Sequence, residues 1–114
     1  MITIEKLNSF GANTAEGLAR CFGNEALFLK LVMTIPDDAV FDRLKQSLDA
    51  KNLDAAFEAA HALKGVLGNL SLTPLYTTAV TITEHLRARD NIDYSGMLAE
   101  FLSKKEELGK LCAE

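Results

Sequence analysis

Residues 52–70 read NLDAAFEAAHALKGVLGNL, and this stretch decides the fold expected for the chain. Apolar residues recur along it in alternating steps of three and four, as they do on the side of a helix that packs against other helices. These positions are Leu53, Ala56, Ala60, Leu63, Leu67 and Leu70. The stretch is therefore predicted to be one long amphipathic helix, and the six positions form its buried seam.

The segments before and after this stretch show the same helical period, and no segment alternates apolar and polar residues as a strand does. Helices are expected over 4–10, 14–21, 24–50, 73–89 and 93–111, and Pro36 either kinks the helix over 24–50 or begins a new helix within it. The expected N-caps are Thr14, Asn24, Asn52, Thr73 and Asp93. Because the connections between the long segments are short, consecutive long helices should lie antiparallel to each other.

The predicted fold class is therefore all-α. We expect an up-and-down antiparallel four-helix bundle with one or two short N-terminal helices. Residues 1–114 should form a single domain, with the core bundle at about 24–112.

The composition indicates a small globular protein and argues against several classes of partner. The chain has 114 residues, of which 48% are hydrophobic and 25% charged, and its net charge is -4. Nucleic-acid binding is not expected, because contact with phosphates needs a basic surface stripe. The apolar stretches are too short to span a membrane, and no secretory leader is evident. We expect a cytoplasmic monomer in which Cys21 and Cys112 are reduced thiols.

Two glycines interrupt the long helix in an organised way. Gly65 and Gly68 lie one turn apart, and each should cost about 0.5–1 kcal/mol relative to alanine. At about 100° per residue, both glycines lie within roughly 40° of His61, and Lys64 lies about 60° to one side. His61 points well away from the apolar seam. The pattern predicts an exposed imidazole beside an ammonium group, with bare backbone along one side.

An exposed imidazole with these neighbours is suited to accept a phosphoryl group. The unprotonated nitrogen of a neutral imidazole is a good nucleophile. A nearby ammonium group favours this neutral form and can then pair with the phosphoryl oxygens. The glycines leave room for a second protein to bring its phosphoryl donor close to His61. No convergent set of acid and base groups is evident, so we expect a phosphoryl carrier and not an enzyme.

The run Ala60-His61-Ala62-Leu63-Lys64-Gly65, with Leu70 and Leu72-Thr73-Pro74-Leu75 after it, resembles the signature of histidine-containing phosphotransfer (HPt) domains. That signature contains a histidine, a variable residue, leucine or isoleucine, lysine and glycine. A small residue follows three positions later, where Gly68 stands here. The family's four-helix fold, length and mid-helix histidine are also similar, and the resemblance extends over residues 24–111.

The resemblance implies a role as a relay in bacterial two-component signalling. HPt domains take a phosphoryl group from the aspartate of a response-regulator receiver domain, or from a histidine kinase or hybrid kinase, and pass it to another receiver. On this interpretation His61 is the phosphoacceptor and Lys64 stabilises its charge, while Phe57, Gly65 and Gly68 contact the partner. Mg²⁺ is expected in the partner receiver domain only, and no cofactor or metal in this chain.

Two departures from the family pattern bear on partner choice. Ser71 stands where the family often has glycine, and Val66-Leu67 stand where it often has small polar residues. Ser71 lies at the end of the predicted helix, so we expect little effect on the chemistry. Val66 is bulkier than the usual residue, and we expect it to narrow the choice of partner.

Three other side chains, two near His61 and one a second histidine, are also considered for a role at the site. Glu58, one turn before His61, either orients the imidazole by a hydrogen bond or is simply solvated. Phe57 either forms an apolar rim for a partner helix or packs against its own bundle. His85 lacks the lysine-glycine context, and we expect it to be an ordinary surface residue.

Two other functions compete with phosphotransfer. A helical adaptor of the same fold would bind receiver domains without being phosphorylated, but such a protein should lack the histidine, and this chain keeps His61, Lys64 and Gly65. A metal-binding bundle would need inward-facing carboxylates and histidines on facing helices. The expected inner faces are apolar, which argues against it.

Overall fold

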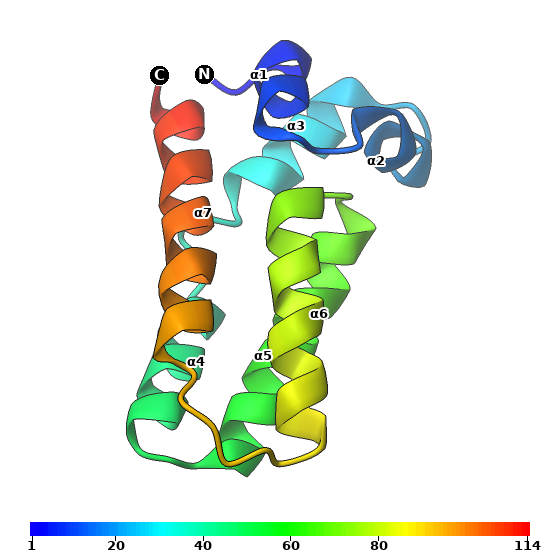
Figure 1. The fold of residues 1–114 in the computed structure, drawn as a ribbon. Helices are drawn as coiled ribbons and strands as arrows, with labels where there is room; N and C mark the ends of the chain where they lie inside the picture. The colour runs from blue at the N-terminus through cyan, green and yellow to red at the C-terminus, as the bar shows by residue number, and fades with distance from the viewer.

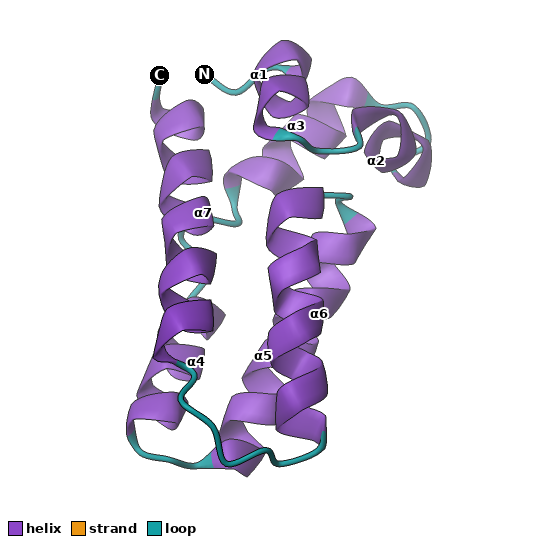
Figure 2. Ribbon diagram, viewed as in Figure 1, coloured by secondary structure: helices purple, strands orange, loops and turns teal.

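The chain folds entirely into helices and turns. The computed structural model describes residues 1–114 and contains seven helices and no strand (Figure 1, Figure 2). The helices are α1 (Ile4–Phe10), α2 (Thr14–Arg20), α3 (Glu25–Met33), α4 (Val40–Asp49), α5 (Leu53–Asn69), α6 (Thr73–Arg87) and α7 (Ser95–Ala113). Helices α4 to α7 lie side by side and alternate in direction, while α1, α2 and α3 gather at one end, where both termini also lie (Figure 1). The predicted all-α class is confirmed.

The helix expected over 24–50 is two separate helices, so three short helices precede α4 where one or two were expected. Pro36 lies between α3 and α4. Proline has no backbone N–H and disfavours helical geometry in the residue before it. Single turns fill the gap, including a hydrogen bond from the Asp38 N–H to the Ile35 carbonyl (3.1 Å). The break was predicted at the correct position, and of the two outcomes considered there, a kink or a new helix, the structure has a new helix, which begins at Val40 and not at Pro36.

Two of the five expected N-caps are present, and the other three are displaced by one residue. Backbone N–H groups at the starts of α3 and α5 donate to the side chains of Asn24 and Asn52. The predicted cap at Asp93 is wrong, because Tyr94 is the N-cap of α7, although Asp93 accepts a hydrogen bond from the Ser95 N–H. The predicted cap at Thr14 is wrong, because Asn13 caps α2 and Thr14 is the first helical residue. Thr73 is likewise inside α6, after a Leu72 cap that makes no side-chain hydrogen bond.

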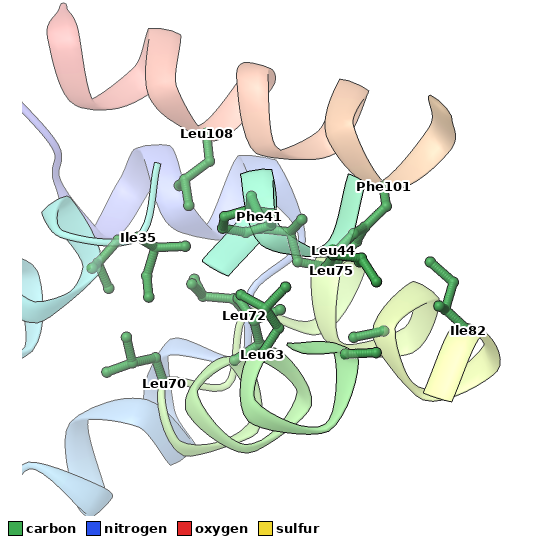
Figure 3. Close-up of a cluster of buried hydrophobic side chains, with 14 of the residues drawn as sticks. Ile35, Phe41, Leu44, Leu63, Leu70, Leu72, Leu75, Ile82, Phe101 and Leu108 are labelled. Atoms are coloured by element: carbon green, nitrogen blue, oxygen red, sulfur yellow. The ribbon is translucent and has the colours of Figure 1, made fainter. Parts of the chain in front are cut away.

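The apolar seam of α5 is buried between α4 and α6. Five of its six predicted residues, Ala56, Ala60, Leu63, Leu67 and Leu70, are at most 5% exposed, whereas Leu53 at the start of the helix is half-buried. Figure 3 shows Leu63 within a cluster that also draws on the other three long helices. The rings of Phe41 from α4 and Phe101 from α7 lie 5.3 Å apart, which joins the first of these helices to the last. The seam that predicted the fold is therefore the centre of the core.

The N-terminal helices are attached to the turn between α5 and α6. The backbone N–H of Asn13 donates to the carbonyl of Ser71 (2.9 Å). The hydroxyl of Ser71, a left-handed residue with φ 54°, donates to the carboxylate of Glu16 (3.0 Å). Because Ser71 directly follows the end of α5, these bonds place α2 beside the last turn of α5.

Gly17 permits this close approach of α2, and we predict that Gly17→Ala destabilises the fold. A Cβ at Gly17 would lie 2.5 Å from Cε1 of Phe28 and 3.0 Å from the backbone oxygen of Leu70. Phe28 is fully buried and has no room to move aside. We expect a loss of about 1–3 kcal/mol in the free energy of unfolding, measured by urea titration.

Gly96→Ala is the matched control for this prediction. Gly96 also lies in the first turns of a helix, and a Cβ there would have no neighbour within 4 Å. This variant should be as stable as the parent or slightly more stable. Equal stability of the two variants would show that α2 does not depend on the missing side chain of Gly17.

Cys21 and Cys112 are free thiols, as expected. Burial raises the pKa of the Cys112 thiol above its ordinary value. None of the seven helices combines the length and the apolar character that crossing a membrane requires.

Candidate functional site

His61 lies in the middle of α5, on the side that faces solvent. The opposite side of α5 is packed against the other helices through Ala56, Ala59, Ala60, Leu63 and Leu67. His61 itself is exposed, as predicted. Because packing fixes the backbone of α5, the imidazole is held on a rigid support and remains accessible to another protein.

The imidazole of His61 stacks on the ring of Phe57, one turn earlier in α5. The ring centroids are 5.6 Å apart and the planes differ by 18°. Two guanidinium groups lie over the same Phe57 ring, that of Arg87 at 5.1 Å and that of Arg89 at 5.0 Å from its centroid. Phe57 is half-buried. Of the two interpretations considered for Phe57, packing within its own chain describes these contacts better than a free apolar rim.

Lys64 and Gly65 lie one turn after His61. Lys64 is half-buried and takes part in none of the ion pairs of the structure. A Cβ added at Gly65 would have no neighbour within 4 Å, so the backbone there is open to solvent. An accessible imidazole, an unpaired ammonium group and bare backbone thus lie within one turn of α5, as the sequence predicted.

Gly68 does not form the bare surface expected of it. A Cβ at Gly68 would lie 2.9 Å from Cε1 and 3.2 Å from Cδ1 of Tyr76, a residue of α6. The Tyr76 ring therefore covers Gly68, and the glycine allows this ring to approach α5. The expectation was wrong because it considered only the faces of α5 itself. In the structure a side chain of the next helix, α6, fills the space beside Gly68.

A polar groove of about 470 Å³ runs along the α5 surface beyond Lys64. Arg20 of α2 contributes a second cationic group to it, held by the Glu16 carboxylate (3.3 Å). The other residues that line the groove are Asn13, Gly65, Gly68, Asn69, Ser71, Thr73 and Tyr76. The surface that begins one turn after His61 is thus open and polar, and not an enclosed cleft.

The two remaining candidates lie apart from the imidazole of His61. Glu58 forms no hydrogen bond with His61 and instead lines a hollow beside Arg43 of α4, which supports the interpretation of a solvated side chain. His85 lies near the end of α6, where its Nδ1 is 2.8 Å from Oδ2 of Asp90. Both of these side chains are 41% exposed, in agreement with a surface role for His85.

Sequence reasoning missed the residues that α6 and the turn after it bring to the site. Tyr76 covers one side of the α5 surface, and Arg87 and Arg89 flank Phe57 on the other. None of them belongs to the lysine-glycine motif. Their positions could be inferred only from the register of α6 against α5.

The comparison with protein families agrees with this geometry. The family model of the Hpt domain matches residues 31–113, which include His61, Lys64, Gly65 and all of α4 to α7. No curated protein and no solved structure matches the chain. Since the family match covers most of its length, the chain belongs to the Hpt domain family, whose members are phosphoryl carriers in two-component phosphorelays.

Proposed function

We propose that this chain carries phosphoryl groups on His61 in a two-component phosphorelay. It accepts the group from the phosphorylated aspartate of a receiver domain, or from a histidine kinase or hybrid kinase, and passes it to another receiver. The observation that carries the proposal is the exposed imidazole of His61 in the middle of the packed helix α5, beside the open backbone of Gly65.

The transfer requires a single nucleophile from this chain. The unprotonated nitrogen of His61 attacks phosphorus, and a P–N bond forms while the P–O bond to the donor aspartate breaks. The aspartate leaves as a carboxylate. In the onward step an aspartate of the next receiver attacks, the P–N bond breaks and the imidazole is restored. We assign Mg²⁺ to the receiver domain, and no cofactor to this chain.

The partner contacts the surface of α5 on both sides of His61. On one side Gly65 leaves the backbone open, and Gly68 allows the Tyr76 ring to approach α5. On the other side the exposed part of Phe57 adds an apolar contact. In this proposal α4 to α7 act as an up-and-down antiparallel four-helix bundle that supports the surface, and the protein works as a monomer in the cytoplasm.

Transfer from phosphorylated receivers tests the proposal. A panel of purified receiver domains would be phosphorylated with radiolabelled acetyl phosphate and Mg²⁺, freed of the small donor, and mixed with this protein. We expect label to move to this chain and, on addition of a second receiver, to move onward. Phosphoramidate, a small donor that phosphorylates imidazole directly, serves as a partner-independent check. If neither phosphoramidate nor any receiver labels the chain, the proposal is wrong.

We predict that Lys64→Ala slows transfer and shortens the lifetime of the phosphohistidine by about 3- to 10-fold, because an exposed ion pair contributes up to about 1 kcal/mol. Lys64→Arg should recover part of the loss, since it keeps the charge and changes the geometry. The deficit of Lys64→Ala should shrink at high salt, where screening weakens the ion pair of the parent. Decay of the label, measured with each variant at low and high salt, checks these outcomes.

Lys51→Ala is the control for Lys64→Ala. Lys51 is an exposed lysine in the turn before α5, and it takes part in none of the ion pairs. Its removal changes the net charge equally and should leave the lifetime unchanged. A complete loss of transfer in Lys64→Ala, or a deficit that neither salt nor arginine alters, would show that Lys64 does more than stabilise charge.

A further inference from the structure

The contact between His61 and Phe57 is the first link of a longer chain of contacts. His61 forms no side-chain hydrogen bond, in contrast to His85, whose Nδ1 is fixed by Asp90. The aromatic contact with Phe57 is therefore the interaction in the structure that restrains the imidazole ring of His61. The two rings are close to parallel, with an angle of 18° between their planes.

Phe57 is in turn held by groups from outside α5. The guanidinium groups of Arg87 and Arg89 lie within 5.1 Å of its ring centroid, in the range of a cation–π interaction. They come from the last residue of α6 and from the turn after it, where Arg89 has a left-handed φ of 55°. Two such cation–π contacts on a half-buried ring favour the ring position in which both are made.

Arg89 is the better anchored of the two arginines. Its Nε donates to Oδ1 of Asp54 at 2.7 Å, and its Nη1 donates to the Leu86 carbonyl. Arg87 has a looser partner, the Glu84 carboxylate at 3.5 Å. Asp54 stands one turn before Phe57 on α5. The contacts therefore run from Asp54 through Arg89 and Phe57 to His61, and they tie the imidazole to the junction between α5 and the end of α6.

We propose that Phe57 is a positioning residue for His61, and that Arg89, anchored by Asp54, acts through Phe57 to hold the imidazole in one orientation for phosphoryl transfer. The expected effect on the rate of phosphoryl transfer rests on the proposed function. The restraint on the His61 ring does not depend on that function. Phe57 thereby has a second role beside its contact with the partner.

The expected size of the effect follows from the conformations open to a histidine on a helix. Such a side chain has about two accessible χ1 wells and a roughly two-fold χ2, and hence about four ring orientations. If Phe57 selects one of them, its removal lowers the competent fraction, so transfer at saturating receiver should slow by about two- to fourfold. The concentration of receiver that gives half of the maximal rate should not change, because Phe57→Leu keeps an apolar side chain on the docking surface and Arg89→Gln keeps Phe57 itself.

The first experiment observes the His61 ring directly. Protons of a ring stacked on an aromatic neighbour resonate upfield of their solvent-exposed positions. In Phe57→Leu and in Arg89→Gln, the NMR signals of the His61 ring protons should move toward the positions of a solvent-exposed histidine, while those of His85 stay in place. In Phe57→Tyr they should remain shifted. Unchanged His61 signals in both Phe57→Leu and Arg89→Gln would overturn the proposal, whether or not the protein is ever phosphorylated.

The second experiment separates positioning from docking. Transfer from the receiver that labels the chain fastest would be followed by rapid quench over a range of receiver concentrations. Phe57→Leu and Arg89→Gln should lower the saturating rate with an unchanged half-saturating concentration, and Phe57→Tyr should restore it. A raised half-saturating concentration with an unchanged saturating rate would show that Phe57 only contacts the partner.

Two controls match these substitutions. Phe22→Leu makes the same change at a 96% exposed site on the turn after α2, and Arg43→Gln removes an exposed guanidinium from α4. Both should behave as the parent in each experiment. If Phe57→Leu is too unstable to study, Arg89→Gln still tests the inference, since it leaves the Phe57 ring in place and removes its anchor.

Discussion

His61→Gln should take no label from any phosphorylated receiver or from phosphoramidate, and it should remain folded. A glutamine amide has no lone pair that attacks phosphorus, so the variant lacks the acceptor. His61 is exposed and its contact is with the Phe57 ring, and glutamine has a higher helix propensity than histidine. The helical circular dichroism spectrum and the unfolding temperature should therefore stay close to those of the parent.

His85→Gln is the control for His61→Gln, because it removes the other histidine of the chain. It loses the contact with Asp90 at the end of α6 and should keep full labelling. The label on the parent should be stable in alkali and lost in acid, as a P–N bond requires. Labelling that persists in His61→Gln and disappears in His85→Gln would move the acceptor to α6 and refute the assignment.

The fold could be predicted largely because one seam governs it. The spacing of the apolar residues along α5, from Ala56 to Leu67, predicts a helix that packs against neighbouring helices. Those residues are buried as expected. The breaks were harder to place. A proline identifies where a helix is interrupted, but not how many residues adopt turns around it, and at Pro36 the interruption extends from Thr34 to Ala39.

The candidate site was predictable where a single helix determines it. The exposure of His61 and the open backbone at Gly65 follow from the rotation of α5, and both agree with the structure. The surroundings of Phe57 and Gly68 depend on which residues of α6 lie opposite them. Arg87 stands about as far after the turn between the helices as Phe57 stands before it. Antiparallel pairing of α5 and α6 therefore predicts that Arg87 lies opposite Phe57, which helical periodicity alone does not.

The two glycines of α5 should respond in opposite ways to the same substitution, and this comparison is the second large effect that we predict. Gly65→Gln places a side chain where a Cβ has no neighbour within 4 Å. The fold should gain up to about 1 kcal/mol, because glutamine is a better helix former than glycine. Transfer from a receiver should nevertheless fall by about 100-fold, since displacing a reacting atom by as little as about 1 Å can have that effect.

Gly68→Gln should instead lose stability, because its Cβ would meet the Tyr76 ring at 2.9 Å. Tyr76 is 38% exposed and can swing outward, so the loss should be about 1 kcal/mol and not a failure to fold. Both predictions are checked by thermal unfolding of the two variants and by their labelling with phosphoramidate and with a receiver. Phosphoramidate is small and should still label Gly65→Gln at a rate near that of the parent. If Gly65→Gln loses labelling by phosphoramidate as well, the substitution has disturbed His61 itself, and Gly65 is not the open approach for a partner protein.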